Sequence, residues 1–216
     1  SFLGSRPREA WRLKSGEVSL WKPEVGWRRV DAADPLEDLD SRIRSRNPAT
    51  VEGLPRFWGG AVGFFGFDVV RHVEDLPNIP SDDLDLPDGL FLFTDQVLVI
   101  DNLLGRGLAV SAVEVETGLG EEELRARYEA GGAKALETIR SLEEGPRLTP
   151  LDLPPEPPDD PPFTSSMTRD AFEDGVRRIR EYIQAGDAFQ VVLSQRLGMP
   201  YGGRPFDLYR VLRTVN

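Results

Sequence analysis

A run of prolines divides this chain more sharply than any other feature of its sequence. Proline lacks a backbone N–H donor and fixes its own φ, so a cluster of prolines favours an extended, polyproline-like segment over a helix or a sheet. We therefore expect a linker over residues 145–163, with one folded domain before it and another beginning after it. The prolines of this segment are Pro146, Pro150, Pro154, Pro155, Pro157, Pro158, Pro161 and Pro162.

The first 30 residues alternate apolar and polar side chains with the two-residue period of antiparallel strands. Ser15-Gly16 predicts a turn between two of these strands. Asp34 followed by Pro35 predicts the start of a helix, because aspartate caps helix N-termini and proline is favoured at the first helical position. We expect this helix to cover one side of the sheet.

Further strands are predicted where glycine and apolar residues dominate. Residues 57–68 mix aromatic residues with glycines, which predicts a buried strand that other backbone or side chains approach closely. Residues 90–93 and 97–100 are continuous apolar runs, typical of strands covered on both faces. Helical spacing continues over residues 121–142, where Gly131-Gly132 makes a kink or break unsurprising. These elements together predict an α/β (α+β) fold, with a mixed or antiparallel sheet and flanking helices.

The segment after the linker supplies only the beginning of another unit. Thr168 predicts the cap of a helix that Gly186 ends, and residues 187–197 are predicted to form a strand. A last apolar helical face runs from Leu208 to Val215. Fewer than about 60 residues are too few for a comfortable core by themselves.

Composition excludes several classes of function. Lys and Arg number 26 against 37 Asp and Glu, and a formal net charge of −11 would repel a nucleic-acid backbone. The chain has no cysteine, which fits a reducing compartment. No apolar run approaches the roughly 20 residues of a membrane helix, so neither nucleic acid nor membrane is expected as a partner, and the cytoplasm is the expected location. A first strand without any leader indicates that the chain begins inside a domain.

The motifs that suggest chemistry are better explained by structure. Ala61-x-Gly63-x-x-Gly66 is one substitution from a dinucleotide fingerprint, but Phe64 and Phe65 would block the approach of a pyrophosphate. The single histidine, His72, has no partners at metal-ligand spacing, and one histidine supports no catalytic triad. The four tryptophans are expected in the core; they are Trp11, Trp21, Trp27 and Trp58.

Polar residues interrupt the predicted strand over residues 187–197, where a strand should be burying itself. They are Gln190, Ser194, Gln195 and Arg196. A site lining or a domain interface would explain them, and a half-exposed edge strand would explain them about equally well.

Three separated segments resemble the large subunit of anthranilate synthase, component I, of the chorismate-utilising enzymes. The first is Ser1-Phe2-Leu3-Gly4, similar to the family's Tyr-Ser-Phe-Ile-Gly strand. The second is the glycine-rich stretch over residues 59–71. The third and most specific runs from Met167 to Arg196 and is followed, at the family's spacing, by residues 205–209 and 212–216.

This resemblance implies three parts: an N-terminal domain over residues 1–144, a linker over residues 145–163, and the start of the chorismate-binding catalytic domain over residues 164–216. It also implies the family reaction, in which ammonia from a glutamine amidotransferase subunit, component II, adds to magnesium-bound chorismate. Pyruvate is then eliminated to leave anthranilate for tryptophan synthesis.

The departures from the family pattern concern its functional sites. The family's Leu-Leu-Glu-Ser segment, part of the pocket for the feedback inhibitor L-tryptophan, would precede Ser1, and its Pro-Ser-Pro-Tyr-Met segment would follow Asn216. We expect Ser1 and Asn216 to come together at the edge of that pocket, as regulatory positions. The family's residues for chorismate and Mg²⁺ lie further downstream, so no catalytic or metal-binding residue is assigned here. The segment is therefore expected to be inactive alone.

Two alternatives remain open. Aminodeoxychorismate synthase component I shares the fold but usually reads Gln-Val-Asn-Leu-Thr-Gln-Arg where this chain has Gln190-Val191-Val192-Leu193-Ser194-Gln195-Arg196, so Val192 favours anthranilate synthase. A non-catalytic module for amino-acid sensing or glutaminase docking is the other alternative.

Overall fold

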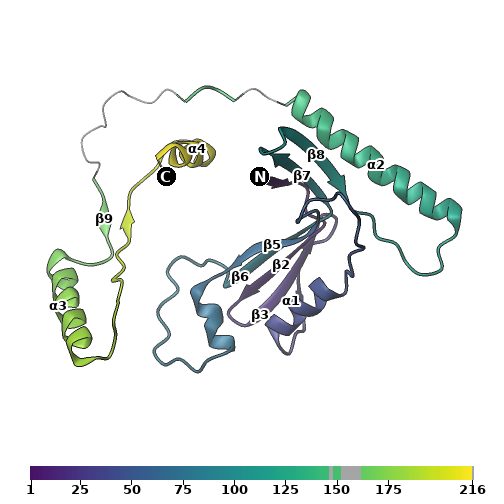
Figure 1. Cartoon of the computed structure of the whole chain (residues 1–216). Helices are drawn as coiled ribbons and strands as arrows, with labels where there is room; N and C mark the ends of the chain where they lie inside the picture. The colour runs from purple at the N-terminus through teal and green to yellow at the C-terminus, as the bar shows by residue number, and fades with distance from the viewer. Residues whose placement is uncertain (146–147, 152–161, 216) are drawn as a thin grey trace. The chain divides into compact units, whose positions relative to one another are not determined.

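The computed structural model describes residues 1–145, 148–151 and 162–215. The chain forms two compact units, Ser1–Pro146 and Arg147–Asn216 (Figure 1). Much of the predicted linker, including residues 152–161, lies outside the described residues. No helix among the described residues is both long enough and apolar enough to cross a bilayer.

The first unit is built around an antiparallel five-stranded sheet with the order β4-β3-β2-β6-β5. Its hairpin turn at Ser15-Gly16 has positive φ at both residues, of 49° and 79°, which confirms the predicted turn. The strands predicted in the first 30 residues are confirmed as well. The five strands are β2 (Glu9–Lys14), β3 (Glu17–Lys22), β4 (Gly26–Val30), β5 (Gly60–Phe65) and β6 (Gly89–Thr94).

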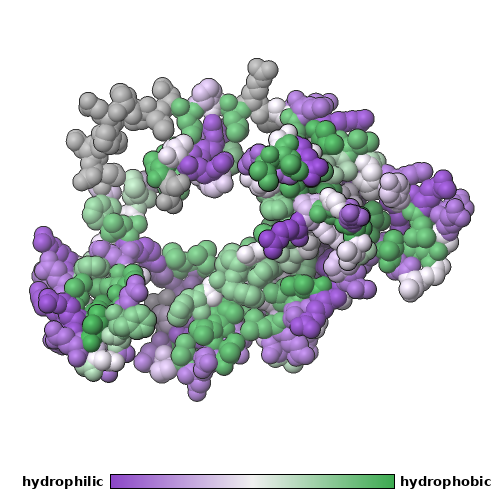
Figure 2. Space-filling model, viewed as in Figure 1, coloured by the Kyte–Doolittle hydropathy of each residue, from purple (hydrophilic) through white to green (hydrophobic). Residues whose placement is uncertain are grey.

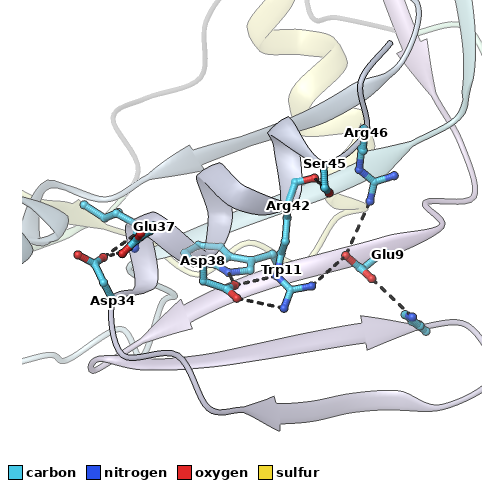
Figure 3. A network of polar contacts seen from close by, with 10 residues as sticks. Glu9, Trp11, Asp34, Glu37, Asp38, Arg42, Ser45 and Arg46 are labelled. Atoms are coloured by element: carbon cyan, nitrogen blue, oxygen red, sulfur yellow. Dashed lines mark hydrogen bonds and ion pairs between the residues drawn. The ribbon is translucent and has the colours of Figure 1, made fainter. Parts of the chain in front are cut away.

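Helix α1 (Pro35–Arg44) covers one face of this sheet, as the sequence predicts (Figures 1 and 3). Asp34 caps it, because its Oδ1 accepts hydrogen bonds from the backbone N–H groups of Leu36 and Glu37 at 2.8 and 3.1 Å. Beneath the helix, Trp11 is fully buried and its Nε1 donates to Asp38 at 2.9 Å. The core joins the sheet, α1 and the 3₁₀ helix η1 (Phe67–His72); its buried members are Trp11, Leu13, Val18, Leu39, Val69 and Phe93.

Electrostatic contacts hold the end of α1 to the sheet (Figure 3). Glu9 is only 8% exposed, and its carboxylate lies 3.7 Å from Lys22 and 3.8 Å from both Arg42 and Arg46. Arg42 also forms a bidentate pair with Asp38, at 2.7 and 3.1 Å. A nearly buried carboxylate is tolerated here because three cations surround it.

A second, three-stranded sheet has the order β1-β7-β8. It consists of β1 (Phe2–Gly4), β7 (Gln96–Asp101) and β8 (Arg106–Ser111). Val97, Leu98 and Val99 are buried in it, which confirms the covered strand predicted for this apolar run.

Helix α2 (Glu121–Glu143) lies against β8 and runs unbroken through Gly131-Gly132 (Figure 1). The kink or break that these glycines suggested is therefore not found. Gly131 is buried, and a Cβ there would lie 2.5 Å from Val113 Cγ2, so the glycine serves close packing of the helix on the strand side.

The glycine-rich strand β5 lies at the edge of its sheet, so the prediction that it is buried is wrong for much of its length. Val62 is 53% exposed and Phe64 48%, on a face that continues across Leu92 of β6. Figure 2 shows the resulting apolar surface in green over β5 and β6. The predicted close approach of backbone is confirmed at Gly63, where a Cβ would meet the carbonyl oxygen of Leu90 at 1.9 Å.

The tryptophans divide between core and surface. Trp11 is in the core as expected, but Trp27 is 42% exposed and lies on the sheet face under the guanidinium of Arg12, 4.5 Å from the ring centroid. Trp21 and Trp58 are half-buried. Trp27 lies on the edge strand β4, and its residue type alone did not predict its exposure.

The second unit contains α3 (Arg169–Ala185), α4 (Pro205–Val215) and the short strands β9 (Thr164–Ser165) and β10 (Leu197–Gly198). Thr168 caps α3 by accepting from the N–H of Ala171 at 3.2 Å, and Gly186 ends it with a φ of 84°, both as predicted. The strand predicted over residues 187–197 is wrong except at its last residue. A strand needs a hydrogen-bonded neighbour, and among the described residues only β9 pairs with this segment, at Leu197.

Candidate functional site

The strand β1 places Ser1 at one end of the three-stranded sheet. Phe2 pairs with Val99 and Gly4 with Val97 in antiparallel register. The backbone nitrogen of Ser1 donates to the carbonyl oxygen of Ile100 at 2.7 Å, and the N–H of Ile100 donates to the Ser1 carbonyl oxygen at 2.8 Å. Ser1 is therefore fixed by the ladder rather than loose at the sheet edge.

A pocket of about 330 Å³ opens beside Ser1. Three segments far apart in the sequence form its walls: the β1 end, the stretch 53–55, and the β7–β8 hairpin. Its lining residues are Ser1, Phe2, Gly53, Leu54, Pro55, Val99, Ile100, Asp101, Asn102, Arg106 and Leu108.

One anion and one cation face each other at this pocket. Asp101 Oδ2 lies 3.6 Å from Arg106 Nε, while Asp101 Oδ1 accepts from the N–H groups of Leu103 and Leu104, both at 3.1 Å. Those two bonds shape the hairpin and orient the carboxylate. The half-exposed guanidinium of Arg106 is the cationic group of this lining, so the pocket can hold a small ligand that carries an anionic group.

Sequence reasoning found only part of this site. It named Ser1, and it named Asn216, which lies outside the described residues. It missed Asp101 and Arg106, although Asp101 ends an apolar run and Arg106 stands between two glycines. These sequence features predict a strand end and a turn. They do not predict that the β7–β8 turn lies beside Ser1 of β1.

The residues that sequence analysis rejected as chemical sites lie apart from this pocket. His72 is exposed at the end of η1. In the described part of the chain, no three His, Cys, Asp or Glu side chains converge to hold a metal ion. The donor set for a magnesium ion is therefore not present among these residues, and no chemical step is derived through one.

The polar residues of the segment 187–197 make contacts mainly beside β9. Gln195 Nε2 donates to Ser165 Oγ at 2.7 Å, and the N–H of Arg196 donates to Ser166 Oγ at 3.0 Å. The side chains of Gln190 and Ser194 are exposed. Because residues 187–196 form no strand, the alternative of a half-exposed edge strand is wrong for them, and a site lining stays a prediction.

Comparison with known proteins gives one consistent assignment. The family model for a chorismate binding enzyme matches residues 4–216. Anthranilate synthase component 1 of Pseudomonas putida is 38% identical over 221 residues, which cover all of this chain and 43% of that protein. The Thermus thermophilus protein of the same name is 37% identical over 222 residues, covering all of this chain and 42% of its own length.

The structural comparison agrees. The crystal structure of anthranilate synthase component I from Streptococcus pneumoniae superposes with a TM-score of 0.70 at 29% identity, covering all of this chain and 45% of that one. The predicted α/β fold with antiparallel sheets is thereby confirmed. The chain belongs to the chorismate-binding enzyme family, is homologous to anthranilate synthase component 1, and spans less than half the length of these relatives.

Proposed function

We propose that this chain is the N-terminal part of an anthranilate synthase component I, a lyase that converts chorismate and ammonia to anthranilate and pyruvate. The observation that carries the proposal is the match of the whole chain, at 38% identity, to the component of that name in Pseudomonas putida. The 0.70 TM-score to a solved component I supports it independently.

We assign a separate role to each part of the chain. Residues 1–144 would be the N-terminal domain, residues 145–163 the linker, and residues 164–216 the opening of the chorismate-binding domain. As the family resemblance implies, Mg²⁺ and chorismate would be bound by residues outside this segment, which would be inactive alone. The name component 1 implies a second component, and we propose a glutamine amidotransferase subunit that supplies ammonia.

The pocket beside Ser1 is the proposed regulatory position. A tryptophan carboxylate would meet the cationic side chain of Arg106 beside Ser1, while Phe2, Leu54 and Leu108 would contact the apolar part. Asn216, which lies outside the described residues, stays a proposed regulatory position. Binding that favours one arrangement of the two domains would then change activity at a distance. We propose the cytoplasm as the location, because a cysteine-free chain suits a reducing compartment.

Complementation of a tryptophan auxotroph that lacks component I tests this function. The test compares the 216-residue chain with the same chain extended to the natural end of its gene. We expect growth without tryptophan only from the extended chain. Growth from the 216 residues alone would contradict the proposed location of the chemistry, and growth from neither would contradict the assignment to tryptophan synthesis.

Aminodeoxychorismate synthase component I is the second candidate, since it shares fold and substrate. Val192, where that enzyme usually has asparagine, favours anthranilate synthase. Purified extended protein should release anthranilate from chorismate and ammonium, which fluorescence detects directly. Release of aminodeoxychorismate alone would establish the second candidate.

A non-catalytic module for amino-acid sensing or glutaminase docking is the third candidate. The stop codon decides it: a reading frame that ends at Asn216 would favour this module, whereas a frame that continues into a chorismate-binding domain would exclude it.

A further inference from the structure

A second and larger pocket lies within the first unit, away from Ser1. Its volume is about 760 Å³, within the range of small-molecule sites. It is formed where the segment before β2 and the end of β3 meet the end of β8 and the middle of α2. Residues from both sheets and from one helix line the pocket, so it is formed entirely within the first unit.

Cationic side chains predominate around this pocket, although the chain as a whole carries a net charge of −11. Four cations line it, against the two anions Asp95 and Glu114. The cations are Arg6, Arg8, Arg127 and Lys134.

Internal ion pairs account for the arginines but not for the lysine. Arg8 lies 2.7 Å from Glu114, Arg6 pairs with Glu137 at 2.6 Å, and Arg127 with Glu123 at 2.9 Å. The Lys134 ammonium forms no ion pair or hydrogen bond with any described residue. It is therefore the cation in this pocket that is free for an anionic group from outside.

The remaining wall is largely apolar and partly flat. Trp21 contributes a half-buried indole, flanked by Pro7 and Pro23. Gly131 lies in close contact with Val113, because a Cβ at that position would lie 2.5 Å from Val113 Cγ2. A flat apolar body can lie against such a wall, since aromatic rings and proline faces pack well together.

One hydroxyl at this wall has unused hydrogen-bonding capacity. Ser111 Oγ is buried and has no hydrogen-bond partner among the described residues. It lies close to Gly131, 3.8 Å from where that residue's Cβ would be. A buried hydroxyl without a partner is costly, so a ligand oxygen that reached it would relieve that cost.

We propose that this pocket binds a small aromatic carboxylate, with the carboxylate on Lys134 and Ser111 and the ring against Trp21. The Lys134 ammonium can pair with a carboxylate, and the apolar wall disfavours a compact, fully hydrated anion such as inorganic phosphate. The proposal concerns a site that shares no lining residue with the pocket beside Ser1, so neither depends on the other.

Benzoate is the probe, and benzamide is its uncharged match in shape. Two-dimensional ¹H–¹⁵N spectra of the 216-residue chain should show benzoate shifting amides near the pocket, such as Trp21, Val113 and Lys134, in a saturable way. Benzamide should leave them unchanged at the same concentrations. Equal responses to both compounds, or shifts confined to other surfaces such as β5, would overturn the proposal.

A matched pair of variants on one helix tests the role of the lysine. Lys134→Gln should weaken benzoate binding about fivefold, the loss of one partly exposed charge contact. Arg140→Gln removes an equal charge from an exposed position of α2 outside the pocket and should change the dissociation constant by less than about twofold. An equal effect of both variants would show that only overall charge matters and would overturn the site.

Ser111→Ala provides a second, independent readout. Because the hydroxyl has no partner, its removal should leave the melting temperature of the free chain unchanged or higher, while benzoate binding weakens. Unchanged benzoate affinity in Ser111→Ala would remove this hydroxyl from the proposed site.

Discussion

At the scale of single residues, Asp38 links the core to the surface of α1. Its Oδ2 accepts from the Trp11 indole N–H at 2.9 Å and pairs with Arg42 at 2.7 Å. Because Trp11 is fully buried, its N–H has no alternative access to water. Asp38 therefore satisfies a core donor, and its ion pair with Arg42 is the lesser part of its role.

Asp38→Ala should lower the free energy of unfolding of the first unit by about 1–3 kcal/mol, the cost of a buried donor left without a partner. Asp40→Ala is the matched control, because Asp40 forms the same kind of pair with Arg44 at 2.7 Å on the exposed side of the helix. That control should change stability by no more than about 0.5 kcal/mol. Urea denaturation followed by tryptophan fluorescence measures both, and equal effects would contradict the role of the Trp11 bond.

Only part of the pocket beside Ser1 could be predicted from the sequence. Ser1 could be named from a family segment, and its strand could be read from the residues after it. Its partners Ile100, Asp101 and Arg106 could not, since they lie about 100 positions away and are brought to Ser1 only by the pairing of β1 with β7.

At the scale of elements, α2 depends on two adjacent glycines with opposite surroundings. A Cβ on Gly132 would meet nothing within 4 Å, whereas one on Gly131 would lie 2.5 Å from Val113 Cγ2. Gly132 thus carries only the entropic cost of glycine in a helix, and Gly131 is needed for packing.

Gly132→Ala should therefore raise the free energy of unfolding by about 0.5–1 kcal/mol. Gly131→Ala should lower it by about 1 kcal/mol or more, because the clash with Val113 exceeds the gain in helix propensity. Chemical denaturation of both variants beside the parent chain checks the pair. If both alanine variants were more stable than the parent, α2 would not pack closely against Val113.

Lys14 helps to attach the loop before β6 to the β2–β3 hairpin. Lys14 Nζ pairs with Asp82, lies 3.3 Å from Asp85, and donates to the carbonyl oxygen of Leu86 at 2.6 Å. The hydrogen bond to Lys14 lowers the pKa of Asp82 below its ordinary value of 3.8, and the same bond raises the pKa of Lys14. Asp82 and Asp85 of this loop thus bind a side chain of the same chain.

The sign of the pH dependence follows from these shifts. A lowered pKa in the folded state adds stability above pH 3.8, and this is lost as the pH falls through the folded pKa of Asp82. Asp82→Asn should therefore be less stable than the parent near neutral pH, with the difference shrinking below about pH 4. Glu116→Gln is an exposed control in another loop, and its stability should equal that of the parent at every pH. If the stability difference between Asp82→Asn and the parent stayed constant down to pH 2.5, the pairing of Asp82 with Lys14 would be contradicted.

At the scale of the whole molecule, the two units differ in how much they bury. The first unit has a core around Trp11 and Phe93, while none of the described residues of the second unit is buried. The apolar stripe of α3 remains uncovered in part, with Val176 and Ile183 both exposed. Helices of this length are only marginally stable without a packed face.

Hydrogen exchange should separate the two units. We expect amides of α3 to exchange within about 100-fold of the unstructured rate, and amides of β2 and β7 to exchange far more slowly. Mass spectrometry or NMR of the 216-residue chain measures this directly. Protection of α3 equal to that of β2 would show that the second unit is as stable as the first.

The exposed face of β5 and β6 belongs to the same scale (Figure 2). Sequence reasoning predicted burial from the aromatic and glycine content of residues 57–68, and that content is indeed apolar. Whether a strand lies inside or at the edge of a sheet depends on how many neighbours pair with it, which its own residues do not specify.

What the sequence by itself determined is what depends on residues a few positions apart. The Ser15-Gly16 turn, the Asp34 and Thr168 caps and the Gly186 helix end were all predictable, since each is a bond or a backbone angle set within one turn of chain. Only the tertiary structure decided that β5 is an edge strand, that residues 187–196 form no strand, and that Ser1 lies beside Arg106. The physical reason is that strands and pockets are completed by residues remote in sequence. The local sequence pattern does not specify which remote residues will pair with a strand or line a pocket.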